Sequence, residues 1–268
     1  MRLFSPYKLI LISFFLISCS DTIENNENDF DFIFPLSVEN YWTYNVEFEN
    51  RTSRDSLFID NEVIISNSLY KEFKTKDDIA SGFYSSSLRN NKIKEINGKL
   101  TLSGNLVVST NQLLSFPLTL SLNDFIIFDK NAQNNRSLNS TPHTGIVYET
   151  VNGYPLTIHY SLQSFGGESF LNYLTPDGNS YSDVKSTQIK LNLTITTEIE
   201  VLGSSQMITA LSPQDVLVSK LYLANGIGVV HSHTITSYTV NNFIANELSI
   251  EETNSQTQDE FLDLYELN

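Results

Sequence analysis

Two histidines in this sequence, His231 and His233, have the spacing that could most directly support chemistry. They are two residues apart in a segment with the alternating pattern of a strand, so both side chains leave it on the same face. Two imidazoles on one face are suitable ligands for one metal ion. Ile227, Val229 and Ile235 share their parity, which predicts that the pair points inward, near the mouth of a barrel. No motif supplies a third ligand, so a pair of surface or partly buried histidines is the alternative interpretation.

A second candidate is a loop of alternating oxygen-bearing side chains, Asp177-Gly178-Asn179-Ser180-Tyr181-Ser182-Asp183. A calcium loop of the EF-hand type needs about six or more oxygen ligands, a glycine at a fixed place and a closing glutamate. Here the glycine is misplaced and the glutamate is absent. We therefore interpret the segment as a polar hairpin turn, with calcium binding as the alternative.

The motifs of common enzyme classes are missing from the sequence. Gly166-Gly167-Glu168-Ser169 lacks the second glycine of a nucleophile elbow. No phosphate-binding loop, His-Glu-x-x-His helix or dinucleotide fingerprint is present. The sequence therefore favours a protein without catalytic residues and without a cofactor. A hydrolase that uses His231 and His233 as metal ligands or as a base is the alternative.

The elements that must position these residues are predicted to be strands. In Tyr41–Asn50 aromatic and aliphatic side chains alternate with polar ones, and Trp42, the only tryptophan, heads the apolar face as a candidate core anchor. The longest alternation is Gln188–Leu202, where Thr197 interrupts the apolar face and predicts a bend or bulge. Further strands are predicted over Ser56–Ile65, Leu69–Thr75, Phe83–Arg89, Lys99–Ser109, Phe116–Leu122, Asp124–Asp129, Gly145–Val151, Leu156–Leu162, Asp215–Leu223, Ile227–Val240, Glu247–Glu252 and Phe261–Leu267.

Turn chemistry separates these strands. Asn-Gly pairs favour tight hairpin turns with positive φ, and they occur at Asn97-Gly98, Asn152-Gly153 and Asn225-Gly226. Helical periodicity is nearly absent, and only a short turn is predicted at Ser212–Asp215. The fold class is therefore all-β: a single antiparallel β-sandwich or a curled, partly open β-barrel over residues 32–268. Two smaller β domains with a break near Asn131–Ser140 are the alternative.

Charge excludes one class of partner. The chain has 16 basic and 31 acidic side chains, a formal net charge of −15. Such a surface repels nucleic acids and anionic headgroups, so we expect no DNA- or RNA-binding role.

The N-terminus has the order of a bacterial export signal. Basic residues precede the apolar run Leu9–Ile17, which is too short for a membrane-spanning helix of about 20 residues but fits a signal peptide. The run ends in Leu16-Ile17-Ser18-Cys19, which resembles the bacterial lipobox. The resemblance implies a signal peptide over Met1–Ser18, removed before Cys19, and attachment to a membrane through lipid on Cys19. A free cysteine inside an ordinary signal peptide is the alternative.

The residues after the lipidated position predict a tether and a location. Residues 19–31 are polar, acidic and rich in Asn, which is typical of a flexible segment. Ser20 stands where an aspartate would retain a Gram-negative lipoprotein in the inner membrane, so we expect the outer membrane. The acidic stretch from Asp21 to Asp29 loosely resembles an export signal to the cell surface, with the periplasmic face as the alternative.

Two further segments resemble a broad group of Bacteroidota outer-membrane lipoproteins of unknown function. Phe34–Tyr44 contains a Pro-Leu pair, a Glu-Asn turn and Trp-x-Tyr, and Leu223–Val230 contains Gly-Ile-Gly-Val-Val. The sequence departs from the group at Glu39, where glycine is common, and at His231, where lysine is common. The resemblance implies a β-rich exported lipoprotein and no particular reaction.

The resemblance to this group also suggests sites of O-glycosylation and a role in the cell envelope. Asp21-Thr22-Ile23 and Asp55-Ser56-Leu57 resemble its O-glycosylation pattern, which implies Thr22 and Ser56 as sites. The function favoured here is a lipid-anchored, non-enzymatic binding or assembly module of the cell envelope, with a glycan, lipid or protein as ligand. A purely structural envelope protein is a further alternative.

Overall fold

The computed structural model describes residues 32–109, 113–114, 116–201, 204–248 and 250–268. The predicted signal peptide and tether, with Cys19 and Thr22, lie outside the described residues. In chain order the elements are β1 (Tyr41–Phe48), β2 (Arg51–Ile65), β3 (Ser68–Thr75), the 3-10 turn η1 (Lys76–Asp78), α1 (Phe83–Leu88), β4 (Lys92–Ile96), β5 (Lys99–Val108), β6 (Leu118–Asp129), β7 (His143–Val151), β8 (Tyr154–Leu174), β9 (Ser180–Val201), β10 (Ser204–Ala224), β11 (Gly228–Thr239), α2 (Asn242–Leu248) and β12 (Thr253–Glu266).

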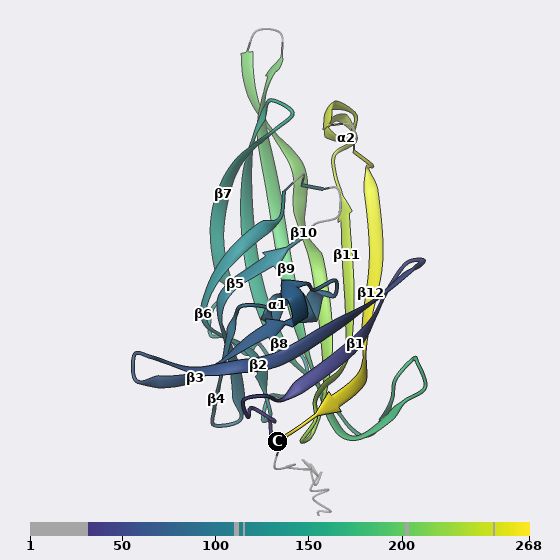
Figure 1. Ribbon diagram of the computed structural model, residues 1–268. Helices are drawn as coiled ribbons and strands as arrows, with labels where there is room; N and C mark the ends of the chain where they lie inside the picture. The colour runs from purple at the N-terminus through teal and green to yellow at the C-terminus, as the bar shows by residue number, and fades with distance from the viewer. Residues whose placement is uncertain (1–31, 110–112, 115, 202–203, 249) are drawn as a thin grey trace, which may run out of the picture.

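Within the described residues the strands form one antiparallel, 12-stranded sheet that curls until it is nearly closed into a barrel (Figure 1). The strand order is β6-β5-β4-β3-β2-β1-β12-β11-β10-β9-β8-β7. The first six and the last six strands are therefore two meanders, joined where β1 pairs with β12. The all-β prediction is confirmed, in its form of a curled, partly open barrel, and strands on both sides of Asn131–Ser140 belong to the same sheet.

Side chains bridge the gap between the two ends of the sheet. The side-chain amide of Asn139 donates to the carbonyl oxygen of Ile126 and accepts from its N–H, each at 3.0 Å. Ser164 of β8 also donates to the Ile126 oxygen, and the Thr187 hydroxyl of β9 donates to the carbonyl oxygen of Ile127 at 2.8 Å. Polar groups of β6 are thus paired although a continuous backbone ladder is lacking there.

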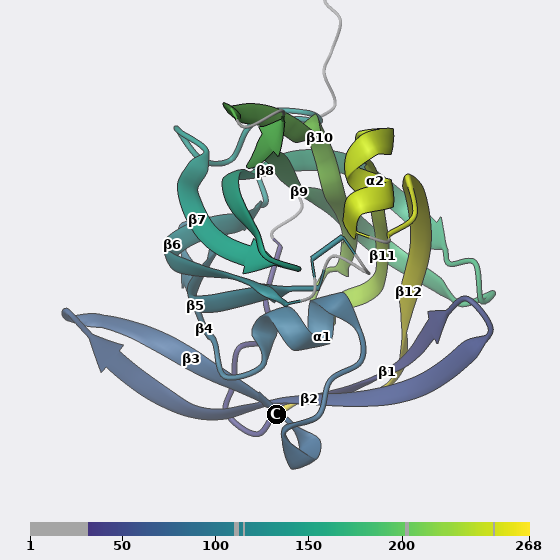
Figure 2. The ribbon, with the colours of Figure 1, turned by 90° about the horizontal axis from the view of Figure 1, so that it is seen from above.

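Helix α1 lies within the ring of strands (Figure 2), which corrects the predicted strand Phe83–Arg89. Four backbone N–H groups at the start of the helix, three of them buried, are satisfied by carboxylates from the barrel wall. Asp55 of β2 accepts from the N–H groups of Ser81 and Gly82, and Glu260 of β12 accepts from those of Tyr84 and Ser85. These partners are remote in sequence, so local patterning gave no sign of the helix.

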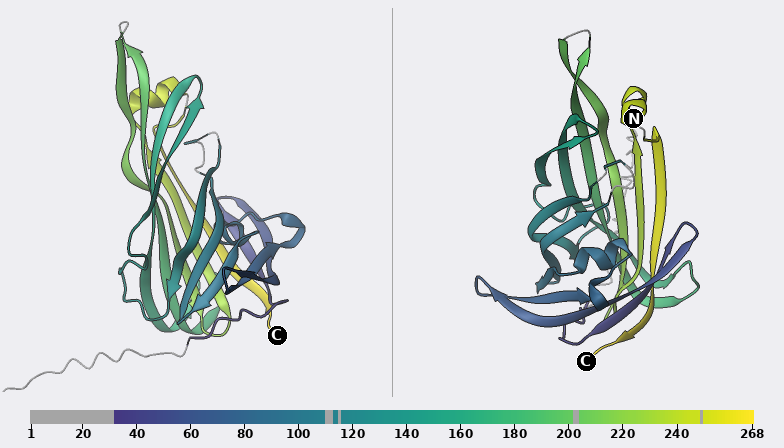
Figure 3. Two further views of the ribbon diagram at one scale, coloured as in Figure 1. Left: turned by 90° about the vertical axis from the view of Figure 1, so that its left-hand side faces the viewer. Right: turned by 45° about the horizontal axis from the view of Figure 1, so that its top comes forward.

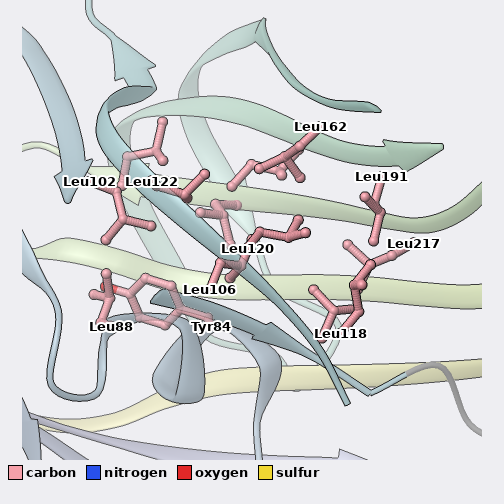
Figure 4. Close-up of a cluster of buried hydrophobic side chains, with 14 of the residues drawn as sticks. Tyr84, Leu88, Leu102, Leu106, Leu118, Leu120, Leu122, Leu162, Leu191 and Leu217 are labelled. Carbon is pink, nitrogen blue, oxygen red and sulfur yellow. The ribbon is translucent and has the colours of Figure 1, made fainter. Parts of the chain in front are cut away.

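The core lies between α1 and the inner faces of the strands. Figure 4 shows Tyr84 and Leu88 of α1 beside leucines of several strands, among them Leu102, Leu120 and Leu191. Trp42 is buried as predicted, and its Nε1 donates to the carbonyl oxygen of Ile227 at 2.7 Å.

The predicted hairpin turns are present where Asn-Gly pairs occur. Asn97 and Gly98 have φ of 53° and 76°, and Asn152 and Gly153 have 51° and 86°. The third turn covers residues 225–227, where Gly226 has a φ of 73°.

Three other local predictions are corrected. Residues Glu247–Glu252 are not a strand: α2 extends to Leu248 and β12 begins at Thr253. The turn predicted at Ser212–Asp215 is not formed, because these residues lie inside β10; the pairing of β10 with β9 shifts register there instead. The irregularity predicted near Thr197 is found in the partner strand, since residues are inserted in β10 opposite Thr196 and Ile195. The sequence of β9 alone does not determine whether such a bulge forms in β9 or in its neighbour β10.

Candidate functional site

The first candidate site lies on the outer face of the barrel, under a hairpin made by the ends of β8 and β9. The hairpin stands outside the ring of strands beside β12 (Figures 1 and 3). Strand β8 bends at a register shift between Gly166 and Ser169. A Cβ atom on Gly167 would lie 2.6 Å from the Ser186 carbonyl oxygen, so the close approach of the two strands requires glycine there.

His231 and His233 point outward, which corrects the predicted inward orientation. Ser232, Thr234 and Thr236 are buried on the other face of β11, and Thr234 and Thr236 line a cavity together with Phe83 of α1. The reason is a bulge: Leu223 pairs with Val229 and Tyr222 pairs with His231, so one residue of β11 is extra. The parity of the residues before the bulge therefore does not carry over to the histidines.

The hairpin and the neighbouring strands bury the His231 side chain, which is only 3% exposed. Its Nδ1 lies 2.7 Å from the Tyr173 hydroxyl of the hairpin, and its Nε2 lies 2.8 Å from Asp259 Oδ1 of β12. Tyr222 from β10 and Phe261 from β12 stack on the imidazole, with ring centroids at 5.2 and 4.7 Å. Both ring nitrogens therefore have a hydrogen-bond partner, and aromatic rings stack on the imidazole.

Asp259 joins the two histidines. His233 lies directly opposite Asp259 in the β11–β12 ladder, and its Nδ1 is 2.8 Å from the same Oδ1 that contacts His231. Burial acts to raise the pKa of the Asp259 carboxyl, but the hydrogen bonds with the two imidazoles outweigh it and hold the pKa below its usual value. The carboxylate is therefore ionised at neutral pH.

The sequence indicated the two histidines but missed Asp259 and Tyr173. The last strand was predicted to begin at Phe261, and so Asp259 was not placed on a strand at all. Tyr173 lies in the part of β8 beyond the bend, where the alternation is weak. The register of β11 against β12 would have identified Asp259, but it is a long-range property.

The other predicted positions do not join this cluster. Ser56 is half-buried on β2, and its Oγ accepts from the Tyr41 hydroxyl at 3.2 Å. The segment from Asp177 to Asp183 is part of a hairpin, as predicted: Asp177–Asn179 lie in the turn after β8, and Ser180–Asp183 begin β9. Its polar side chains bond to one another: Thr175 donates to Asp177, and Asn179 Nδ2 donates to Asp177 at 2.9 Å.

The second candidate site is a cavity of ≈ 570 Å³ inside the barrel, bounded by α1 and the inner faces of β1, β2, β11 and β12. Arg51 and Arg89 line it together with hydroxyl, amide and aromatic side chains, and none of the described lining residues is acidic. Gln256 Oε1, also in the lining, is a buried acceptor without a hydrogen-bond partner among the described residues. The two guanidinium groups are the charged groups among these lining residues, and the carboxylates of Asp55 and Asp78 lie just behind the lining, against Ser81 and Arg89.

Comparisons with protein-family models, with curated proteins and with solved structures found no match. Among the described helices, none has the length and apolar character needed to cross a membrane. The function must therefore be argued from the residues of the two sites themselves.

Proposed function

We propose that this chain is a lipid-anchored, non-enzymatic binding module of the cell envelope whose barrel takes an acidic saccharide into the cavity beside α1. The observation that carries the proposal is the pair of arginines, Arg51 and Arg89, in a lining without carboxylates. The lipid anchor at Cys19 and the outer-membrane location are parts of the proposal that rest on the N-terminal sequence alone.

The cavity has the size and lining of a small-molecule site. Ligand pockets commonly measure about 300–1,000 Å³ and combine apolar walls with a few polar groups. Phe48 and Phe83 supply aromatic faces, while serine, threonine and glutamine side chains supply hydrogen-bonding groups. A sugar hydroxyl is the kind of donor that Gln256 Oε1 lacks.

The two arginines specify the charge of the ligand. The Arg89 Nη1 donates to the carbonyl oxygen of Asp78 at 2.7 Å, and its Nε lies 3.9 Å from the exposed Asp78 carboxylate, so both contacts orient the guanidinium near the cavity and leave the Nη2 group for a ligand. Guanidinium groups bind carboxylates in a bidentate manner, so a uronic or sialic acid unit fits better than a neutral hexose.

The outer cluster gives little support to the form of the hydrolase alternative in which His231 acts as a general base. A general base must reach the proton that it removes. His231 has both nitrogens engaged and is covered by the hairpin, so it cannot reach a substrate in this arrangement.

A glycan array that presents neutral oligosaccharides beside their uronic-acid- and sialic-acid-bearing counterparts tests the proposal. We expect binding to the acidic members, with affinity reduced at least tenfold in the double variant Arg51→Gln/Arg89→Gln. Arg54→Gln is the matched control, because Arg54 lies on β2 but pairs with Asp263 on the outside. Equal binding of neutral and acidic glycans, or undiminished binding by the double variant, would contradict the proposed charge selectivity.

A further inference from the structure

We propose that His231, His233 and Asp259 bind one divalent transition-metal ion, with zinc as the ion that suits the ligands best. The site is independent of the barrel cavity, since these side chains lie on the opposite face of β11 and β12. It also goes beyond the sequence, which offered two imidazoles and no third ligand.

The positions of the ligand atoms are those that a metal requires. One nitrogen of each imidazole and one oxygen of Asp259 all lie within 4.8 Å of one another. In a tetrahedral zinc site with bonds of about 2.0–2.2 Å, two ligand atoms lie about 3.4 Å apart. The distances from His231 Nε2 and His233 Nδ1 to Asp259 Oδ1 are each 2.8 Å, so an ion between them requires each of these two pairs to open by about 0.6 Å, while the two imidazole nitrogens already lie within 4.8 Å of each other.

The surroundings of His231 fix it as a ligand. Metal-bound histidines generally use their second nitrogen to bond an oxygen of the protein, which sets the tautomer and the ring orientation. The Tyr173 hydroxyl has this place at 2.7 Å from Nδ1. With the ion bound, His231 carries its proton on Nδ1 and donates to the Tyr173 oxygen, while the Nε2 lone pair faces the metal. The stacked rings of Tyr222 and Phe261 allow little rotation of the imidazole.

The charge balance favours a cation. Both imidazoles converge on one carboxylate oxygen of Asp259, the negatively charged side chain of the cluster. The basic side chain of this region, Lys220, lies 3.4 Å from Glu168 and so is partly neutralised. Two neutral imidazoles and one carboxylate give a divalent ion a net charge of +1, on a protein whose overall charge is −15.

The ligand set also determines the kind of site. Imidazole and carboxylate suit zinc and its neighbours among the divalent transition metals, whereas calcium and magnesium prefer oxygen ligands alone. Three protein ligands leave a fourth position, and His233, with 39% of its side chain exposed, marks the side that opens to solvent. Because Tyr173 belongs to the hairpin, the ion would fasten the hairpin to the barrel wall.

Calorimetric titration of the full-length protein in detergent, freed of metal with EDTA and dialysed, tests the site with zinc chloride as the probe. We expect one zinc ion per chain, and a visible absorption spectrum typical of four-coordinate cobalt when cobalt(II) replaces zinc. His233→Gln and Asp259→Asn should each weaken binding at least tenfold. His159→Gln is the matched control, since His159 is an exposed histidine of β8 outside the cluster.

The metal affinity of a hairpin variant distinguishes this site from an adventitious one. Tyr173→Phe keeps the ring stack on Tyr222 but removes the hydroxyl, and loss of such a supporting group typically weakens metal affinity about 10–100-fold. If Asp259→Asn does not fold by circular dichroism, His233→Gln decides, because that side chain is at the surface. Absence of saturable zinc binding by the wild type, equal affinity of His233→Gln, or loss of binding in His159→Gln overturns the proposal.

Discussion

Buried polar atoms, each with one specific partner, connect the barrel wall to its interior. The Trp42 Nε1 donates to the Ile227 carbonyl oxygen at 2.7 Å, and the Tyr44 hydroxyl donates to the Val229 carbonyl oxygen at 2.9 Å. Both aromatic side chains come from β1, and both acceptors lie where β10 turns into β11. Burial raises the pKa of Tyr44 far above its usual value, so its hydroxyl stays protonated and remains a donor. The two bonds therefore hold the start of β11, and with it the bulge that turns His231 outward.

Trp42→Ala should lower the free energy of unfolding by about 3–5 kcal/mol, because it removes a fully packed indole and leaves the Ile227 oxygen without its donor. The indole is 4% exposed and stacks on Phe73 with ring centroids 6.2 Å apart. Urea denaturation followed by circular dichroism measures the change. Trp42→Phe is the control: it keeps an aromatic ring and should lose only about 1–3 kcal/mol. An unchanged midpoint for Trp42→Ala would show that the indole does not anchor the core.

Glu260 should make the barrel less stable as the pH rises. Burial raises the pKa of its carboxyl from 4.5 to about 7, although hydrogen bonds from Ser85 and Tyr84 oppose the shift. Between these pH values the folded protein holds a proton that the unfolded chain has released. The stabilisation is therefore complete below pH 4.5 and lost as the pH rises toward 7, by roughly 3 kcal/mol. Denaturation of wild type and Glu260→Gln at several pH values measures the difference in slope, and parallel curves would contradict this role.

At the scale of elements, strands were predictable where one face is buried against the core, and elements that depend on remote partners were not. The alternation in Tyr41–Asn50 and in Gln188–Leu202 was sufficient to identify β1 and most of β9. Helix α1 could not be predicted, because Asp55 and Glu260 satisfy its first N–H groups from distant strands. The ends of β8 and β9 pack on the outer face of the barrel, so they lack the two-residue pattern of a strand with one solvated face. The candidate metal site was the least predictable feature, because its residues come from β10, β11, β12 and the hairpin.

The hairpin of β8 and β9 should detach from the barrel wall in Gly167→Ala. The added Cβ would lie 2.2 Å from Ser186 Oγ and 2.6 Å from the Ser186 carbonyl oxygen, and the backbone atom cannot move away easily. We expect faster amide hydrogen exchange in the hairpin and cleavage by a broad-specificity protease near its tip, with little change in the rest of the barrel. Gly145→Ala is the control, because the three atoms nearest to the Cβ there belong to the far end of the Tyr160 side chain and not to the backbone. Identical exchange in the two variants would show that Gly167 does not set the bend.

At the scale of the whole molecule, the two ends of the barrel differ. Phe32, the first described residue, packs on Phe128 with ring centroids 5.2 Å apart, and the backbone N–H of Asn268 donates to Asn40 at 2.8 Å. Both ends of the described part of the chain, Phe32 and Asn268, therefore lie at one end of the barrel, as Figure 1 shows for the C-terminus. The cavity is lined farther along the barrel, at the end of β1 where Phe48 pairs with Gln258 of β12. A lipid on Cys19 would join the barrel at the first end, through the flexible tether predicted over residues 19–31.

The predicted lipid anchor and the side of the membrane on which the barrel lies are testable together in cells. Cys19→Ala should release the protein from membranes or leave its precursor uncleaved, because an anchor of two or more acyl chains is lost. The wild type should sediment with the outer membrane, since Ser20 rather than aspartate follows the cysteine. If the acidic stretch after Ser20 directs the protein to the surface, proteinase added to intact cells should digest the barrel, whereas a periplasmic barrel is protected until lysis. Recovery of the wild type in the inner-membrane fraction, or membrane attachment of a processed Cys19→Ala variant, would show that the N-terminal signals do not act as proposed.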